Sequence, residues 1–207
     1  MTFVTGNAGK LREVTTLLNA HLTVGSGEAE EGLQEHEDYI GMVKEGLDLP
    51  ELQGDPKTIS VEKCRAASKL IAGPVVVEDT GLCCNALGGL PGPYIRWFLQ
   101  GCGAEGVHKM LQGFGDYSAY AETIFSFTSG PGEEIHTFVG RTQGRIVPPR
   151  GISSFGAVSW DPVFEPEEGG GKTYAEMTKE DKNKISQRGR AIQQLRTFLL
   201  QNKTLWK

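Results

Sequence analysis

The chain lacks a long hydrophobic run: no segment approaches the roughly 20 apolar residues needed to cross a bilayer. Its first residues show neither a basic leader nor an apolar signal core, which favours a cytoplasmic protein. Basic charge is not in excess either. A net charge of −5 argues against a broad nucleic-acid surface, which needs clustered Lys and Arg. A small anion in a local positive pocket remains compatible with this balance.

Thiol and metal motifs are also scarce. The four cysteines include no CxxC pair, so we expect reduced and mostly buried thiols, not a disulfide framework or a zinc site; they are Cys64, Cys83, Cys84 and Cys102. The four histidines have no HExxH spacing, and no GxSxG elbow is present. The sequence therefore disfavours zinc hydrolases and serine esterases.

What is present is the composition of one folded domain. The 207 residues include 28 glycines and 38% hydrophobic residues, as in a globular protein with many tight turns. β-Prone and helix-periodic segments alternate, which predicts an α/β fold with a mixed sheet. The expected strands are residues 1–5, 74–80, 119–128, 135–140 and 144–147, and the expected helices are residues 9–18, 58–72, 105–111 and 182–201. Residues 25–46 are acidic and predict an exposed loop or short surface helix, to which we assign no chemistry.

The first candidate site is Thr5-Gly6-Asn7-Ala8-Gly9-Lys10, between an expected strand and an expected helix. Glycines let the backbone approach an anion closely, and N–H groups at a helix start point toward it. Alone, the pattern is more typical of a structural turn. Lys10 opposes the helix macrodipole, so a bound anion would account for its position.

A carboxylate set is the second candidate. Glu78 and Asp79 end a β-branched run, and Glu51 follows Pro50. Mg²⁺ prefers a few carboxylate oxygens together with substrate phosphates, so these acids predict a magnesium site; solvated charges or helix caps are the alternative.

The third candidate site consists of aromatic and basic segments. Phe155-Gly156 and Trp160-Asp161 could stack a base and accept hydrogen bonds from it, although Trp160 could equally be a core residue. The basic run of residues 182–191 is compatible with a solvated helix face. Residues 169–173, GGGKT, resemble part of a phosphate-binding P-loop but lack its first glycine, so we expect an ordinary loop.

Taken together, these segments resemble the inosine triphosphate pyrophosphatase (Ham1-like) family, most closely its eukaryotic branch. The resemblance runs nearly end to end through TGNAGK, LPELQG, VVVEDTGL, NALGGLPGPYIRWF, SWDPVF, TYAEM and KNKISQRGRA. It implies one domain over residues 1–207, with an elongated mixed sheet flanked by helices and an active-site cleft between two lobes. It also implies a homodimer.

The activity implied by the resemblance is hydrolysis of ITP, dITP and XTP to a monophosphate and pyrophosphate, with Mg²⁺ or Mn²⁺ as cofactor, to cleanse nucleotide pools. Glu51 and Asp79 would hold the metal, and Asp79 would also orient or deprotonate the attacking water. Arg188 would donate to the 6-oxo group of the purine. The remaining substrate-binding positions are Thr5, Gly6, Asn7, Ala8, Gly9, Lys10, Lys63, Thr80, Arg96, Phe155, Gly156, Trp160, Asp161, Lys182 and Gln187.

The chain departs from the family pattern in four places. Ala157-Val158-Ser159 is inserted before Trp160-Asp161, Gln187 replaces a His, and Arg96 stands where Lys is frequent; the acidic segment is a further insertion. Two alternatives therefore stay open: a Maf-like pyrophosphatase for modified nucleotides, and a non-catalytic nucleotide-binding protein. The intact Lys10, Glu51 and Asp79 argue against the second.

Overall fold

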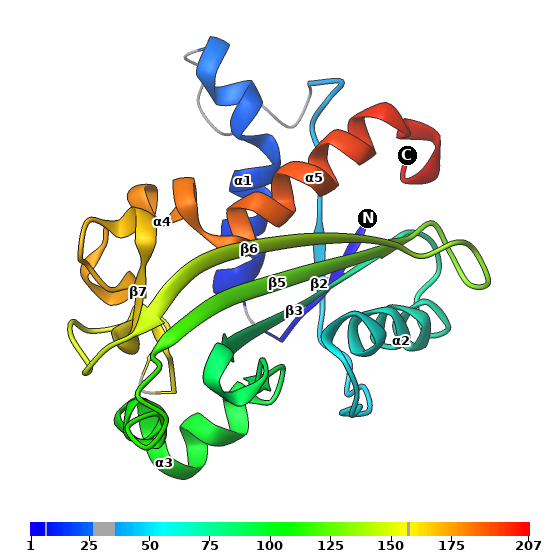
Figure 1. Cartoon of the computed structure of the whole chain (residues 1–207). Coiled ribbons are helices and arrows are strands. Elements are labelled where there is room, and N and C mark those ends of the chain that lie inside the picture. Colours follow the sequence, from blue (N-terminus) through cyan, green and yellow to red (C-terminus); the bar gives the residue numbers. More distant parts are fainter. Residues whose placement is uncertain (7, 27–35, 157) are drawn as a thin grey trace. The chain divides into compact units, whose positions relative to one another are not determined.

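The structure is a computed structural model that describes residues 1–6, 8–26, 36–156 and 158–207 (Figure 1). The chain divides into two compact units. The first unit contains Met1–Glu78, Ile124–Phe138 and Ala191–Lys207, and the second contains Asp79–Thr123 and Val139–Arg190. Because β3, β5 and β6 each cross a boundary, neither unit is a continuous stretch of sequence.

Seven strands in the described residues form one sheet, in the order β2-β1-β3-β5-β6-β7 with β4 paired to β3. β1 runs parallel to β2 and β3, whereas β3–β4 and β6–β7 are antiparallel, so the predicted mixed sheet is confirmed. The strands are β1 Thr2–Val4, β2 Val43–Glu45, β3 Val75–Cys84, β4 Pro91–Gly92, β5 Ser118–Thr128, β6 His136–Ile146 and β7 Phe164–Pro166.

Helices flank the sheet. They are α1 Ala8–Ser26, α2 Pro56–Ser68, α3 Ile95–Met110, α4 Lys179–Ile185 and α5 Gln187–Gln201. Short 3₁₀ turns connect them: η2 Asn85–Leu87, η3 Asp161–Val163, η4 Glu167–Gly169, η5 Tyr174–Glu176 and η6 Lys203–Leu205. Every helix in the described residues is too short or too polar to pass through a bilayer.

The first unit buries both faces of β1 and of its part of β3, because successive side chains of a strand point to opposite sides. Phe3 and Val76 pack in one core with residues of α1 and α5, whereas Val4 and Val77 pack in a second core with residues of α2. Figure 1 shows α2 on the side of β1 and β3 opposite α1. Burial of each fully buried side chain among them, Phe3, Val76 and Val77, contributes about 1.5–3 kcal/mol.

The second unit has a core of its own. Leu82 and Cys84 from β3 pack with Ala119 and Ala121 from β5 and with apolar residues of α3. α3 is longer than the predicted 105–111 and bends at Gly103, whose φ of 68° breaks the helical backbone. The core thus fixes the ends of β3 and β5 that belong to this unit.

The expected single helix over 182–201 is wrong. Ser186 has an extended backbone, with ψ of 149°, and separates α4 from α5. Its hydroxyl accepts a hydrogen bond from the N–H of Gly189 at 3.1 Å and so caps α5. A Cβ on Gly189 would lie 2.3 Å from the carbonyl oxygen of Asn183, so the break needs glycine at this position.

The expected division into strands 135–140 and 144–147 is also wrong, since β6 runs unbroken from His136 to Ile146. Gly144 does not end the strand: it lets β7 approach closely, because a Cβ there would lie 2.5 Å from the carbonyl oxygen of Glu165. β7 itself, three residues long, was not predicted.

The acidic segment is only partly an exposed loop. β2 pairs with β1, and Ile40 is fully buried in the first core. Asn19 of α1 fixes Ile40 through two hydrogen bonds to its backbone, of 2.8 and 3.1 Å. The expectation is therefore corrected for residues 40–45, whereas residues 27–35 lie outside the described residues.

The cysteines are mostly buried, as expected. Cys64, Cys83 and Cys84 are buried and Cys102 is exposed, and all four are free. Burial raises the pKa of Cys83 to about 11 and that of Cys84 to about 12, which keeps both thiols protonated and unreactive at neutral pH.

Candidate functional site

Two lysines contact Glu78, a buried residue of β3 in the first unit. Glu78 lies on the same face of the strand as Val76, toward α1, and its side chain is 1% exposed. Lys10 from the first turns of α1 approaches Glu78 Oε2 at 3.6 Å. Lys63 from α2 donates from Nζ to the backbone oxygen of Glu78 at 3.1 Å. Two cations from different helices therefore converge on one residue of β3.

The start of α1 leaves room for a ligand near the backbone. Gly6 has no positive φ, and a Cβ added there would meet no heavy atom within 4 Å. Neither conformation nor packing within the described residues requires glycine at this position, and the space beside its backbone is open. Thr5 is half-buried, and the first turn of α1 contains no acidic residue; Asn7 lies outside the described residues.

Asp79 and Thr80 follow on the part of β3 that belongs to the second unit. Asp79 is half-buried, with its Oδ2 atom shielded from solvent. Thr80 hydrogen-bonds Thr123 of β5 through their hydroxyls at 2.8 Å, which fixes the strand beside Asp79. The acid thus stands on a rigid strand and not on a loop.

Glu51 lies in an exposed segment. Among the described residues, no three side chains of His, Cys, Asp or Glu come together as a metal site. The available donors are carboxylates. Mg²⁺ is commonly held by one or two carboxylates together with substrate phosphates, so this donor type fits it.

A second cluster surrounds Asp161 in the second unit. Asp161 is 4% exposed, and Lys182 of α4 contacts its Oδ2 at 2.7 Å. Ser153 also donates to Oδ2, at 3.2 Å. A buried carboxylate with a cation and a hydroxyl on one oxygen is held in a single orientation.

The ring of Phe155 lies beside Lys182 and Arg188. Lys182 Nζ lies 5.0 Å from the centre of its ring and the Arg188 guanidinium carbon lies 5.7 Å from it, both within cation–π range. Phe155 is 41% exposed, so part of the ring remains open for contact. Gly156, with φ of 88°, makes the turn that follows. Three predicted base-site residues, Phe155, Asp161 and Arg188, are thus brought together. Lys182, which was predicted for the cationic cradle of the triphosphate, lies among them.

Gln187 and Trp160 lie at the inner side of this cluster. The Tyr174 hydroxyl donates to Gln187 Oε1 at 3.0 Å, and burial raises the pKa of Tyr174, which keeps this donor protonated. Trp160 packs edge-on against Phe164, with ring centres 5.6 Å apart, and belongs to the rim of the second core. Arg96 is exposed on α3 and lies over the Trp97 ring at 5.8 Å.

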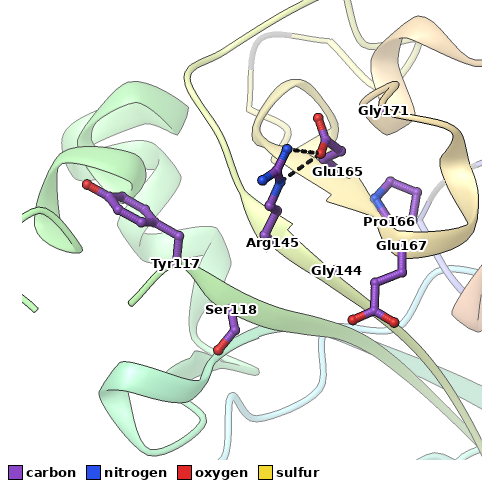
Figure 2. Close-up of a pocket in the computed structure, with 8 residues that line it drawn as sticks. All are labelled: Tyr117, Ser118, Gly144, Arg145, Glu165, Pro166, Glu167 and Gly171. Atoms are coloured by element: carbon purple, nitrogen blue, oxygen red, sulfur yellow. Dashed lines mark hydrogen bonds and ion pairs between the residues drawn. The ribbon is translucent and has the colours of Figure 1, made fainter. Parts of the chain in front are cut away.

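A pocket of about 370 Å³ lies elsewhere in the second unit (Figure 2). None of its lining residues was predicted to be functional: Tyr117, Ser118, Gly144, Arg145, Glu165, Pro166, Glu167 and Gly171. Figure 2 shows Arg145 directed at Glu165, and Arg150 contacts the other oxygen of Glu165 at 2.6 Å. The charges of the pocket are thereby largely neutralised within the protein.

Sequence reasoning included Glu78 only as one acid of the carboxylate set, and it left out the two serines around Asp161. The ion pair of Glu78 with Lys10 and its burial are tertiary properties. Ser153 and Ser159 show no pattern of their own, and only their closeness to Asp161 in the fold reveals them.

A family comparison covers almost the whole chain: residues 1–198 match the model of the Ham1 family. The chain belongs to the Ham1 family. All the sites above lie within the matched residues.

Solved structures of Ham1 proteins agree with this fold. The Ham1 protein of Staphylococcus aureus is 25% identical, with a TM-score of 0.73 over 96% of this chain and 98% of that one. A HAM1 protein from Coxiella burnetii, 24% identical, shares the fold with a TM-score of 0.77 over 97% of this chain and 99% of that one. A Mycobacterium abscessus protein described as a nucleoside-triphosphatase and dITP/XTP pyrophosphatase is 26% identical, with a TM-score of 0.65 over 94% and 98%.

Proposed function

We propose that this Ham1-family chain is a nucleoside-triphosphate pyrophosphatase that hydrolyses ITP, dITP and XTP to the monophosphate and pyrophosphate and so cleanses nucleotide pools. The match of residues 1–198 to the Ham1 family carries the proposal. The similarity to the Mycobacterium abscessus dITP/XTP pyrophosphatase supports the choice of substrate. A homodimer in the cytoplasm completes the proposal.

The triphosphate binds at the start of α1. The first turn of α1, which begins at Ala8, offers backbone N–H groups and the positive end of the helix dipole, which favour an anion. Lys10 and Lys63 add charge around Glu78 of β3. Since Glu78 already compensates Lys10, the protein holds this lysine in place before the substrate arrives.

Asp79 acts on the attacking water. Its carboxylate accepts a proton from the water or orients it toward the phosphate, and a rigid strand holds it for this task. Thr80 adds a polar contact beside it. Positioning and neutralisation of charge are the main contributions in such phosphate chemistry.

Carboxylates of Glu51 and Asp79 would hold a divalent cation, Mg²⁺ or Mn²⁺. When bound, the cation would neutralise charge on the triphosphate.

The purine binds in the Asp161 cluster. Phe155 stacks on the base, the Asp161 carboxylate accepts from the base N–H, and Arg188 donates to the 6-oxo group. Adenine has an amino group at this position and no N–H at N1, so it would leave both protein groups unpaired. This accounts for preference of inosine and xanthosine nucleotides over ATP.

The test is a product analysis with purified protein. Wild type should release pyrophosphate and the monophosphate from dITP, ITP and XTP with Mg²⁺, should be slow on dATP, and should lose activity with a chelator. Orthophosphate release would contradict the proposal. Faster turnover of a modified pyrimidine triphosphate would support the Maf-like alternative instead, and calorimetric ITP binding without product would support a non-catalytic binding protein.

A further inference from the structure

The residues inserted before Trp160 bring a buried hydroxyl into the base site. Ser159, the last of the three, is 6% exposed, although a serine in a surface loop is usually solvated. Its neighbour Val158 is 51% exposed. Burial of the polar member of the pair, with the apolar one outside, is the reverse of what solvation alone favours.

The Ser159 hydroxyl joins two parts of the Asp161 environment. Its oxygen accepts from the backbone N–H of Asp161 at 3.2 Å, and it hydrogen-bonds the Ser153 hydroxyl at 2.8 Å. Ser153 in turn donates to Asp161 Oδ2 at 3.2 Å. The two hydroxyls therefore close a ring that begins at the backbone of Asp161 and returns to its carboxylate.

The Ser153 hydroxyl is the donor in both of its side-chain contacts in this ring, to Ser159 Oγ at 2.8 Å and to Asp161 Oδ2 at 3.2 Å. Because a hydroxyl has one proton, the two contacts share it. Ser153 also accepts from the backbone N–H of Phe155 at 3.1 Å, so the same hydroxyl fixes the residue that carries the stacking ring.

The hydrogen-bonded ring of the two serines and Lys182 contact the same carboxylate oxygen of Asp161. Lys182 contacts Oδ2 at 2.7 Å, as Ser153 does at 3.2 Å. With Oδ2 engaged by both groups, Oδ1 is the oxygen left to accept from a ligand.

We infer that Ser159, with Ser153, is a positioning residue for base recognition: the inserted hydroxyl holds Asp161 so that Oδ1 accepts the N1–H of a 6-oxopurine. The inference rests on the proposed function, because Asp161 has this role only if a purine binds there. Ser159 itself touches no substrate.

The experiment compares dITP and dATP in wild type, Ser159→Ala, Ser153→Ala and the double variant. Each single variant should raise KM for dITP about fivefold, the worth of one net hydrogen bond, and leave kcat near wild type. The dITP-to-dATP ratio of kcat/KM should fall by the same factor. In the double variant, the dITP-to-dATP ratio of kcat/KM should fall no further than in the more affected single variant, because the same hydrogen-bonded ring is broken in each case.

Two controls separate positioning from general damage. Ser154→Ala removes an exposed hydroxyl from the same loop and should leave kcat and KM for both substrates unchanged. In an Asp161→Asn background, Ser159→Ala should not change the substrate ratio further, whereas a merely structural effect would persist there. Urea unfolding of each variant verifies that it is folded.

The outcomes are distinct. Wild-type selectivity in folded Ser159→Ala, or additive losses in the double variant, would overturn this inference and leave the proposed function standing. If wild type neither binds nor hydrolyses dITP, the proposed function fails and the inference fails with it.

Discussion

The Lys10 region in the first unit and the Asp161 region in the second unit are built from different interactions. Around Lys10, two lysines from two helices contact Glu78. This region therefore acts on a ligand mainly through charge. Around Asp161, the carboxylate, the aromatic ring of Phe155 and the serine hydroxyls have fixed directions. Charge attracts any triphosphate equally, whereas directed hydrogen bonds distinguish bases. We therefore expect losses common to all substrates from the first region and losses of selectivity from the second.

The largest expected effect is that of Asp79→Asn. Loss of the carboxylate removes general-base action, so kcat should fall about 10²–10⁴-fold for dITP and dATP alike. Steady-state kinetics with both substrates measures this. Asp48 is an exposed acid of the first unit, and the control variant Asp48→Asn should leave kcat unchanged for both substrates. A variant with unchanged kcat would show that Asp79 is not the base.

Asp161→Asn should act mainly on selectivity. Exchange of a charge-assisted hydrogen bond for a neutral amide should lower the dITP-to-dATP ratio of kcat/KM about 10- to 100-fold. Equal losses with both substrates would mean that this region is not specific for the base, and the contrast between the two regions would be lost.

Lys10→Gln should weaken binding without affecting selectivity. Removal of one phosphate-binding charge should raise KM about tenfold for every triphosphate. The buried Glu78 loses its ion pair, so the free energy of unfolding should fall by about 1–2 kcal/mol in urea titrations. Lys10→Arg keeps the charge and should recover most of both losses. A changed dITP-to-dATP ratio in Lys10→Gln would contradict the assignment.

Glu165→Gln should leave catalysis unchanged and affect stability alone. Glu165 is buried beneath Arg145 and Arg150 at the pocket of Figure 2, and the Arg150 hydrogen bond holds its pKa below the ordinary 4.5. At pH 7 the variant should be about 2 kcal/mol less stable.

The pH dependence of that stability follows from the lowered pKa. A carboxylate with a depressed folded pKa stabilises the protein above its unfolded pKa, and this contribution is lost as pH falls through the folded pKa. The difference between wild type and Glu165→Gln should therefore shrink below about pH 4.5. A difference that stayed constant down to pH 2 would show that the pair does not titrate as stated.

The sequence predicted the first region better than the second because the first is formed at the ends of continuous segments. The β-branched run 75–77 and the turn at residues 5–10 are local patterns, and helix periodicity found α2. The break at Ser186 could not be read from periodicity, because the apolar positions 185 and 192 keep helical spacing yet serve two different cores. β7 and the ring at Ser159 depend on contacts between distant residues. The roles of the site residues themselves stay predictions.

The most direct measurement of the central claim is a competition in which wild type acts on equal amounts of dITP and dATP with Mg²⁺, with products followed by ³¹P NMR. The account predicts that pyrophosphate and dIMP appear together while dATP remains almost unconsumed. Orthophosphate with dIDP, or consumption of both nucleotides at the same rate, would contradict it.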